Sequence, residues 1–271
     1  MEFIETKKIT NNIAKITLTN GKKFNPLSLN VLRHLNSELN DLSNDSEVKA
    51  IIISSNGPGF SAGHDLQELK QHKNNKEFFT KLFNECSDLM LKIMKTPQPV
   101  IAEIPGVAAA AGCQLVATCD LAIASNEAVF ITPGVNIGLF CSTPMVAVSR
   151  SLGRKKTMEM LLTGESMNAK DAVSFGLINK NVPLDELEIT VLNFAKLIAS
   201  KPTSTVRIGK EAFYKQAELP IENAYKYTSE VMAQNMKHVL IGTPLVKGVP
   251  TPMLFVILLI AQRWFMKKAV V

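Results

Sequence analysis

A segment rich in small residues, Gly106 to Gln114, joins a strand-like run at 99–104 to a helix-like run at 115–119. Small residues at a strand-to-helix junction let a ligand approach the main chain, and the free N–H groups at the helix start carry partial positive charge. Such groups can hold an anion, or the oxyanion that forms when a carbonyl group reacts. The same composition also lets a helix pack tightly on a sheet, so the segment alone leaves both interpretations open.

A second turn of small residues, 61–63, lies in a loop at 57–66 that contains glycines and a proline. It is followed directly by His64 and Asp65. Asp65 is placed to cap the helix that follows, and we favour this structural role over a catalytic one. His64 lies in the turn itself, so both a functional role and an ordinary loop position remain open for it.

The spacing of apolar residues predicts the elements that position these turns. Strands alternate with helices as far as about residue 182 and helices alone follow, which predicts an α/β core with a helical C-terminal part. Unbroken apolar runs predict buried strands at 48–55, 99–104 and 120–125. Helical spacing and capping residues predict helices at 28–42, 76–95, 144–152, 154–162, 169–175, 184–200, 203–216 and 221–236.

Composition limits the possible functions. The chain has 271 residues, of which 46% are hydrophobic, and a net charge of +6 that is spread rather than clustered. A spread positive charge suits an anionic ligand such as a polyphosphate cofactor, and it does not favour nucleic acid. The four cysteines and four histidines show no metal-ligand spacing, which predicts a reduced protein without a metal site. The acidic N-terminus does not resemble a transit peptide, which suggests a cytosolic protein or a form without its leader.

Three segments carry a resemblance to a known family. In order and spacing they resemble the enoyl-CoA hydratase/isomerase (crotonase) superfamily, and the match covers about residues 5–236. The segments are Phe60-Ser61-Ala62-Gly63-His64-Asp65-Leu66, Gly106 to Gln114 with Cys119-Asp120-Leu121-Ala122-Ile123-Ala124, and Leu162-Thr163-Gly164-Glu165 with Ala169-Lys170-Asp171-Ala172 and Gly176-Leu177-Ile178.

The resemblance implies a crotonase-like spiral of ββα units over residues 1–200 and a helical trimerisation region at 201–237. It also implies a homotrimer or dimer of trimers, a mitochondrial location with a cytoplasmic alternative, and an acyl-CoA thioester as substrate. Coenzyme A then arrives with the substrate, and no separate cofactor is expected. The tail at 238–271 departs from the family; its apolar run at 253–261 is shorter than the about 20 residues that a membrane span needs.

The resemblance also implies the site. In the family two main-chain N–H groups hold the thioester oxygen, and by motif position these belong to His64 and Ala111. This agrees with the two small-residue turns described above. The positions expected to contact the substrate are Ala62, Gly63, Asp65, Gly112, Lys22 and Lys23.

Two positions depart from the family's pattern. Hydratases of this family use two glutamates, because one proton must be taken and another given. Here Gln114 and Gly134 stand in their places. Glutamine can orient water but cannot accept its proton near neutral pH, and glycine can do neither. We therefore predict weak or absent hydratase activity, with Asn136, His64 and Asp65 as possible substitutes.

Other chemically active side chains are interpreted as structural. Cys113 is expected to be a small buried thiol rather than a nucleophile. Glu103 and Glu165 are expected to have structural roles. The function predicted is acyl-CoA binding in fatty-acid metabolism, either as a non-catalytic regulatory protein or as an enzyme of the thioesterase or decarboxylase type. RNA binding is a third hypothesis, supported only by mild basicity.

Overall fold

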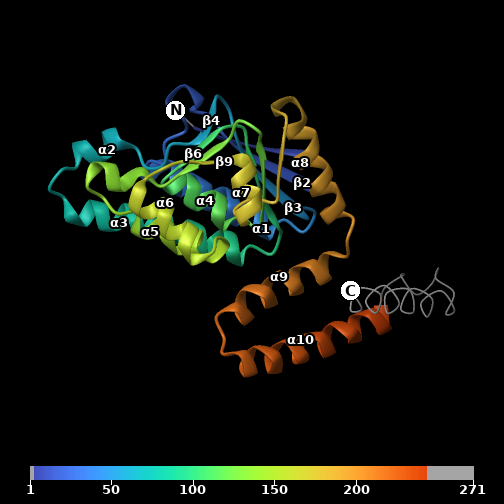
Figure 1. The fold of residues 1–271 in the computed structure, drawn as a ribbon. Helices are drawn as coiled ribbons and strands as arrows, with labels where there is room; N and C mark the ends of the chain where they lie inside the picture. The colour runs from blue at the N-terminus through green and yellow to red at the C-terminus, as the bar shows by residue number, and fades with distance from the viewer. Residues whose placement is uncertain (1–2, 243–271) are drawn as a thin grey trace, which may run out of the picture. The chain divides into compact units, whose positions relative to one another are not determined.

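The computed structural model describes residues 3–242 (Figure 1). The chain forms two compact units, one through Glu211 and a second that begins at Ala212. The first unit contains two sheets. The six-stranded sheet has the order β1 (Ile4–Thr10), β2 (Ile13–Leu18), β3 (Ala50–Ser55), β5 (Val100–Ile104), β7 (Leu121–Ser125) and β10 (Lys180–Val182). The four-stranded sheet has the order β4 (Gly59–Ser61), β6 (Val107–Ala109), β8 (Val129–Ile131) and β9 (Met167–Asn168).

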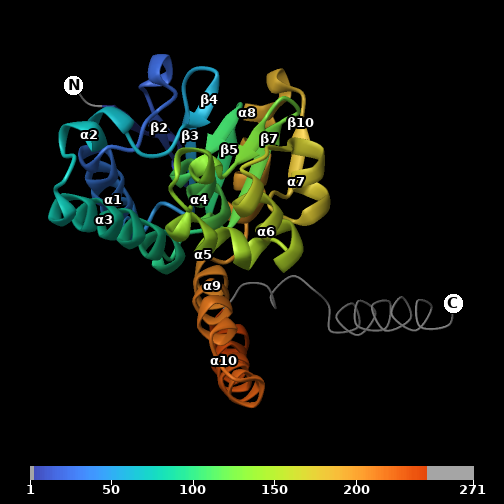
Figure 2. The ribbon, with the colours of Figure 1, turned by 60° about the vertical axis from the view of Figure 1, so that its left-hand side comes forward.

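Both sheets are mainly parallel. In the large sheet only the β1–β2 hairpin pairs in the antiparallel sense, and in the small sheet only β8 and β9 do. Figure 2 shows β2, β3, β5, β7 and β10 in order across the large sheet. Three times a strand of the large sheet leads to a strand of the small sheet and then to helices: β3 to β4, β5 to β6, and β7 to β8. The ββα units and the mixed α/β class predicted from sequence are therefore confirmed.

The helices of the first unit lie between and after these strands. They are α1 (Leu29–Asn44), α2 (Leu66–Gln71), α3 (Lys76–Lys95), α4 (Ala111–Thr118), α5 (Ser142–Ser151), α6 (Arg154–Thr163), α7 (Ala169–Phe175) and α8 (Leu184–Ala199), with 3-10 helices η1 (Gly21–Lys23) and η2 (Pro133–Ile137). Helix α9 (Thr203–Ala217) begins in the first unit, and α10 (Ile221–Gly242) belongs to the second.

The large sheet is buried on both faces, which explains why its strands are continuous apolar runs. Alternate residues of β3 point to opposite sides: Ile51 joins the cluster that contains α1, α3 and α4, while Ile52 joins the cluster that contains Val191 of α8. Helix α1 presents a buried leucine stripe to the first cluster and begins at Ser28, whose hydroxyl accepts from the N–H of Val31 at 3.3 Å. The helix predicted at 28–42 is confirmed.

The segment at 106–114, predicted as a turn, is mostly regular secondary structure. Strand β6 takes up 107–109 and α4 starts at 111, so Ala110 alone separates them. Likewise, β4 lies inside the loop predicted at 57–66. Each of these strands has three residues and is held by pairing across the chain, Gly59 beside Val107 in β4 and β6. Such short strands have no periodicity of their own that a sequence pattern could reveal.

Lys210, at the middle of α9, makes buried contacts within the first unit. Its ammonium group donates to the carbonyl oxygens of Ile93 at 2.9 Å and Gln98 at 3.0 Å, and pairs with a carboxylate oxygen of Asp120 at 2.6 Å. Only 7% of the Lys210 side chain is exposed, so this is a buried ion pair with additional carbonyl partners. Burial lowers the pKa of Lys210, and the charge of Asp120 opposes that shift.

No helix within residues 3–242 is long and apolar enough to cross a bilayer. The apolar run predicted at 253–261 lies outside the described residues, and α10 continues to Gly242, past the boundary expected at 237.

Candidate functional site

The two small-residue turns lie against each other. Strands β4 and β6 run side by side, so the turns that follow them meet at the same edge of the small sheet. Gly63 has a φ of 87°, and a Cβ atom on it would lie 2.9 Å from the oxygen of Ala109 and 3.1 Å from the nitrogen of Ala111. A Cβ atom on Gly112 would collide with the oxygen of Ser61. Both glycines are therefore needed for this close approach.

Two main-chain N–H groups at this contact are unused. Within residues 3–242, the N–H groups of His64 and Ala111 donate no hydrogen bond. Their neighbours do donate: Gly63 to the hydroxyl of Ser61 at 3.1 Å, and Ala110 to a carbonyl oxygen of β8 at 2.9 Å. Because Ala111 is the first residue of α4, its N–H group lies at the positive end of the helix.

Ala110 turns the chain from β6 into α4 through a strained conformation. Its φ of 48° and ψ of −115° are rare for a residue with a Cβ atom. Such strain costs about 1–3 kcal/mol, and it persists where surrounding structure holds the residue in place. The hydrogen bond from Ala110 to Ile131 supplies part of that restraint.

Gln114 lies on the first turn of α4 with only 3% of its surface exposed. Its amide oxygen is 3.9 Å from the sulfur of Cys86, which is on α3. Burial raises the pKa of Cys86 to about 12, so the thiol keeps its proton and can donate to that oxygen. The residue is therefore fixed against α3 as a neutral amide, without a group that can accept a proton.

Gly134 lies in η2 where no side chain has room. A Cβ atom there would collide with the oxygen of Leu139 and lie 2.9 Å from the sulfur of Cys141. The N–H group of Leu139 donates to the oxygen of Gly134 at 2.9 Å, which closes the loop over this position. A glutamate at position 134 is therefore incompatible with the loop conformation.

Of the three possible substitutes for the glutamates, two have other partners. The carboxylate of Asp65 accepts from the N–H groups two and three residues ahead, at 2.8 and 3.4 Å, which confirms its predicted role as a helix cap. The side-chain amide of Asn136 packs on Gly164, since a Cβ atom built on Gly164 would lie 2.8 Å from the amide nitrogen of Asn136. Cys113 is fully buried, and burial raises its pKa to about 12, which confirms the buried-thiol interpretation.

The remaining predicted residues lie away from the contact or on the surface. Glu103 pairs with Lys15 at 2.8 Å on the face of the sheet that α8 covers, which confirms a structural role. Glu165 is exposed, as are Ala62 and the two lysines of η1, Lys22 and Lys23.

The side chain of His64 packs against α3. Its Nδ1 atom is 3.3 Å from the oxygen of Leu27, and its ring meets Phe83 edge-on with 5.3 Å between centroids. Burial lowers the pKa of His64 below its usual 6.5, and the hydrogen bond to Leu27 opposes this shift. Sequence reasoning missed the contribution of α3 because Phe83 and Cys86 resemble ordinary core residues of an amphipathic helix.

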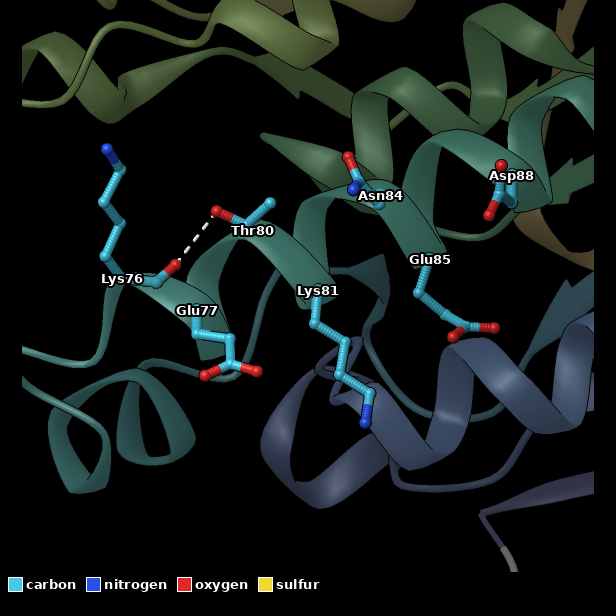
Figure 3. Close-up of a pocket in the computed structure, with 7 residues that line it drawn as sticks. All are labelled: Lys76, Glu77, Thr80, Lys81, Asn84, Glu85 and Asp88. Carbon is cyan, nitrogen blue, oxygen red and sulfur yellow. Dashed lines mark hydrogen bonds between the residues drawn. The ribbon is translucent and has the colours of Figure 1, made fainter.

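The opposite face of α3 carries a surface hollow of about 600 Å³ (Figure 3). Glu85 there is held by Arg33 at 3.3 Å, and the hydroxyl of Thr80 donates within the helix to Lys76 at 2.9 Å. The hollow includes none of the predicted site residues. Its lining residues are Lys76, Glu77, Thr80, Lys81, Asn84, Glu85 and Asp88.

The repeated ββα unit and the contact between two turns with unused N–H groups define a protein of the crotonase fold. The chain belongs to the enoyl-CoA hydratase/isomerase family, whose model matches residues 8–241. It is 46% identical over 224 residues to the human protein "Enoyl-CoA hydratase domain-containing protein 3, mitochondrial", a match that covers 83% of this chain and 74% of the relative.

Solved structures are similar over most of the chain. The crystal structure of that human protein has a TM-score of 0.84 at 44% identity, covering 87% of this chain and 92% of its own. An enoyl-CoA hydratase from Mycobacterium smegmatis has a TM-score of 0.87 at 40% identity, covering 92% and 95%. A Dictyostelium discoideum protein named "Probable enoyl-CoA hydratase, mitochondrial" is 31% identical over 79% of this chain and 76% of its own.

Proposed function

We propose that this protein binds acyl-CoA thioesters and holds the thioester oxygen with the N–H groups of His64 and Ala111. The observation that carries the proposal is the contact between Gly63 and Ala111, beside which both N–H groups lack an acceptor in the described chain. One such donor contributes roughly 3 kcal/mol to stabilising charge on a carbonyl oxygen. Membership of the enoyl-CoA hydratase/isomerase family supports the choice of ligand.

The same site lacks the means to hydrate a double bond. Gln114 is a neutral amide, and Leu139 occupies the space that a side chain at Gly134 would need. Hydration requires a group that takes a proton from water and one that gives a proton to carbon. We therefore assign weak or absent enoyl-CoA hydratase activity to this protein.

The proposal extends to assembly, location and the ligand's nucleotide end. The second unit exposes large apolar side chains, namely those of Phe213, Ile221, Tyr225, Met232 and Met236. This exposure supports assembly as a homotrimer or dimer of trimers. Relatives named as mitochondrial support that compartment. A role in fatty-acid metabolism is the part of the proposal that follows from acyl-CoA as the ligand. Lys22 and Lys23 are exposed and carry the charge that the phosphates of coenzyme A require.

Calorimetry with a thioether analogue of an acyl-CoA tests the binding, with bare coenzyme A as the reference ligand. A Gly63→Val variant fills the contact, and Gly153→Val is its matched control because nothing lies within 4 Å of a Cβ atom there. We expect the wild type and Gly153→Val to bind the analogue more tightly than coenzyme A. Gly63→Val should lose that difference.

Two results would contradict the proposal. If the wild type binds neither ligand, the acyl-CoA function is wrong. If it binds them equally, the thioester group is not recognised and the N–H groups have another purpose. Rapid hydration of crotonyl-CoA by the wild type would separately contradict the assignment of weak hydratase activity.

A further inference from the structure

A small crevice, which we call the α9 crevice, lies where the connection from α8 to α9 meets the residues that precede β3 and β5. Lys49 directly precedes β3, and Gln98 lies two residues before β5. Lys201 belongs to the connection, Thr203 is the first residue of α9, and Arg207 lies on the second turn of that helix. All of these residues are in the first unit, and none belongs to the proposed acyl-CoA site.

Three cationic side chains line the α9 crevice without a carboxylate partner. Within residues 3–242, the side chains of Lys49, Lys201 and Arg207 form no ion pair and donate no hydrogen bond. Among the described residues that line the crevice there is no aspartate or glutamate. Like charges gathered at one place repel each other, so the cluster is stabilised when an anion binds among them.

The positive end of α9 opens at the same crevice. The helix begins at Thr203, has 15 residues, and carries no acidic side chain in its first turn. The N–H groups of Thr203, Ser204 and Thr205 donate no hydrogen bond within the described chain. Free N–H groups at the start of a helix, together with the helix dipole, attract an anion.

Two residues of the crevice carry buried polar atoms that lack a partner. Only 1% of the surface of Gln98 is exposed. Its Nε2 atom donates to the main-chain oxygens of Leu42 at 3.0 Å and Val48 at 3.2 Å, which fixes the orientation of the amide and leaves Oε1 without a donor among the described residues. The Nε atom of Arg207 is likewise buried and has no acceptor there. A ligand that accepts from nitrogen and also donates to oxygen matches this pair.

The size and chemistry of the α9 crevice select among small anions. It encloses about 10 Å³, which is about the room that one oxygen-sized group needs. A tetrahedral anion therefore enters with one oxygen and leaves the others at the mouth, where Lys201 is exposed. Hydrogen phosphate has an O–H group for Oε1 of Gln98 and negative oxygens for the cations. Sulfate has the same shape and charge but no O–H group at neutral pH.

We propose that the α9 crevice is a binding site for inorganic phosphate. Hydrogen phosphate binds there with its protonated oxygen on Gln98 and its charged oxygens toward Lys49, Lys201 and Arg207. This site is separate from the proposed acyl-CoA site and does not depend on it.

Calorimetry on the full-length protein tests the proposal, with inorganic phosphate and sulfate as the two ligands at constant ionic strength and neutral pH. The main variant is Arg207→Gln, which removes the charge and keeps a polar side chain. Arg154→Gln is the matched control, because it removes the same charge from an exposed position at the start of α6 that does not line the crevice. Lys201→Gln is a second test variant whose exposed position makes misfolding no concern.

We expect the wild type to bind phosphate about tenfold or more tightly than sulfate, because sulfate leaves the buried oxygen of Gln98 without a donor. Arg207→Gln should weaken phosphate binding about tenfold or more, since hydrogen bonds between charged groups are the strong ones. Lys201→Gln should weaken it by up to about fivefold, as expected for an exposed charge. Arg154→Gln should bind phosphate as the wild type does.

Four results would overturn the proposal. A wild type that binds neither anion leaves the crevice to water alone. Equal affinity for phosphate and sulfate means that the oxygen of Gln98 does not select the ligand. Equal losses of phosphate affinity in Arg207→Gln and Arg154→Gln mean that net charge, and not the crevice, attracts the anion. If Arg207→Gln loses as much affinity for bare coenzyme A as for phosphate, the crevice holds a phosphate group of coenzyme A instead of the free ion.

Discussion

Gly63 and Ala111 are in contact although 47 residues separate them in the chain, with only 3.1 Å between a Cβ atom built on Gly63 and the nitrogen of Ala111. This contact exists because β4 and β6 are neighbours in the small sheet. It brings two unused N–H groups to one edge of that sheet and leaves no space for a side chain between them. A ligand that binds at this contact therefore meets main-chain atoms before it meets side chains.

Position 134 should tolerate no side chain. Gly134→Ala is expected to lower the free energy of unfolding by about 1–3 kcal/mol, because its Cβ atom would collide with Leu139 and overpacking costs that much. Gly153→Ala should change stability little, since its surroundings are open and its φ is −62°. Urea denaturation measures both. Equal stability of the two variants would mean that the loop at 134–141 adapts freely.

Ala110 should be replaceable by glycine without loss of stability. Glycine removes strain of about 1–3 kcal/mol from the folded state but adds about 0.5–1 kcal/mol of entropy to the unfolded state. We therefore expect Ala110→Gly to be neutral or stabilising by urea denaturation. Ala117→Gly, inside α4, has no such strain to relieve and should cost about 1 kcal/mol. A comparable loss in both variants would show that Ala110 is not strained.

Lys210 should be among the most costly lysines to replace. Lys210→Met keeps the aliphatic stem but removes a buried charge that pairs with Asp120, and loss of a buried partner costs about 3–5 kcal/mol. Lys7→Met removes an exposed pair with Glu5 and should cost about 1 kcal/mol or less. Thermal and urea unfolding compare the two. A small loss of stability in Lys210→Met would mean that the ion pair with Asp120 and the two carbonyl contacts of Lys210 do not contribute measurably to the free energy of unfolding.

His64 should make stability depend on pH in the acid range. Its pKa is lowered by burial, so above its usual value of 6.5 the ring is neutral in both folded and unfolded chains. As the pH falls through 6.5, the unfolded chain takes up a proton that the folded chain does not, and the free energy of unfolding decreases. Urea denaturation between about pH 7.5 and about pH 5 measures this loss.

In the same pH series, His64→Asn should show a smaller decrease than the wild type, because asparagine does not titrate. Parallel pH curves for the two proteins would contradict the lowered pKa of His64.

Lys22 and Lys23 should strengthen binding through charge alone. Replacing both by alanine is expected to weaken binding of bare coenzyme A by up to about fivefold for each lysine, because an exposed charge contributes up to about 1 kcal/mol. The difference from the wild type should shrink at high salt, where surface charges are screened. Lys170 and Lys180, also exposed, provide the matched double variant. Calorimetry at two salt concentrations compares the two double variants. Equal losses of coenzyme A affinity in both would mean that the phosphates do not bind at Lys22 and Lys23.

Much of the fold was predictable from the sequence. The helix at Lys76–Lys95 was predicted with its observed limits, because Pro97 ends it and a regular apolar stripe runs through it. The cap role of Asp65 followed from residue type and position alone. Strands β4, β6, β8 and β9 were missed because each has two or three residues and depends on partners distant in sequence.

The site was predictable only in part. The residues of the two turns could be named from their small size and from family resemblance, but nothing local predicts that Phe83 and Cys86 contact His64 and Gln114. Those contacts depend on how α3 packs on the sheet. The lack of space at Gly134 could not be predicted either. The atom in the way is the main-chain oxygen of Leu139, which every residue type would place there.

The unused donors beside Gly63 belong to the main chain, and this has a consequence for how such a protein can diverge. Every substitution except proline preserves a main-chain N–H group. Mutations at positions 64 and 111 can therefore alter the surrounding side chains while the donors persist, provided that the turns keep their path. Over evolutionary time the acidic and basic side chains can be exchanged, lost or regained on a scaffold whose main-chain donors mutation rarely removes.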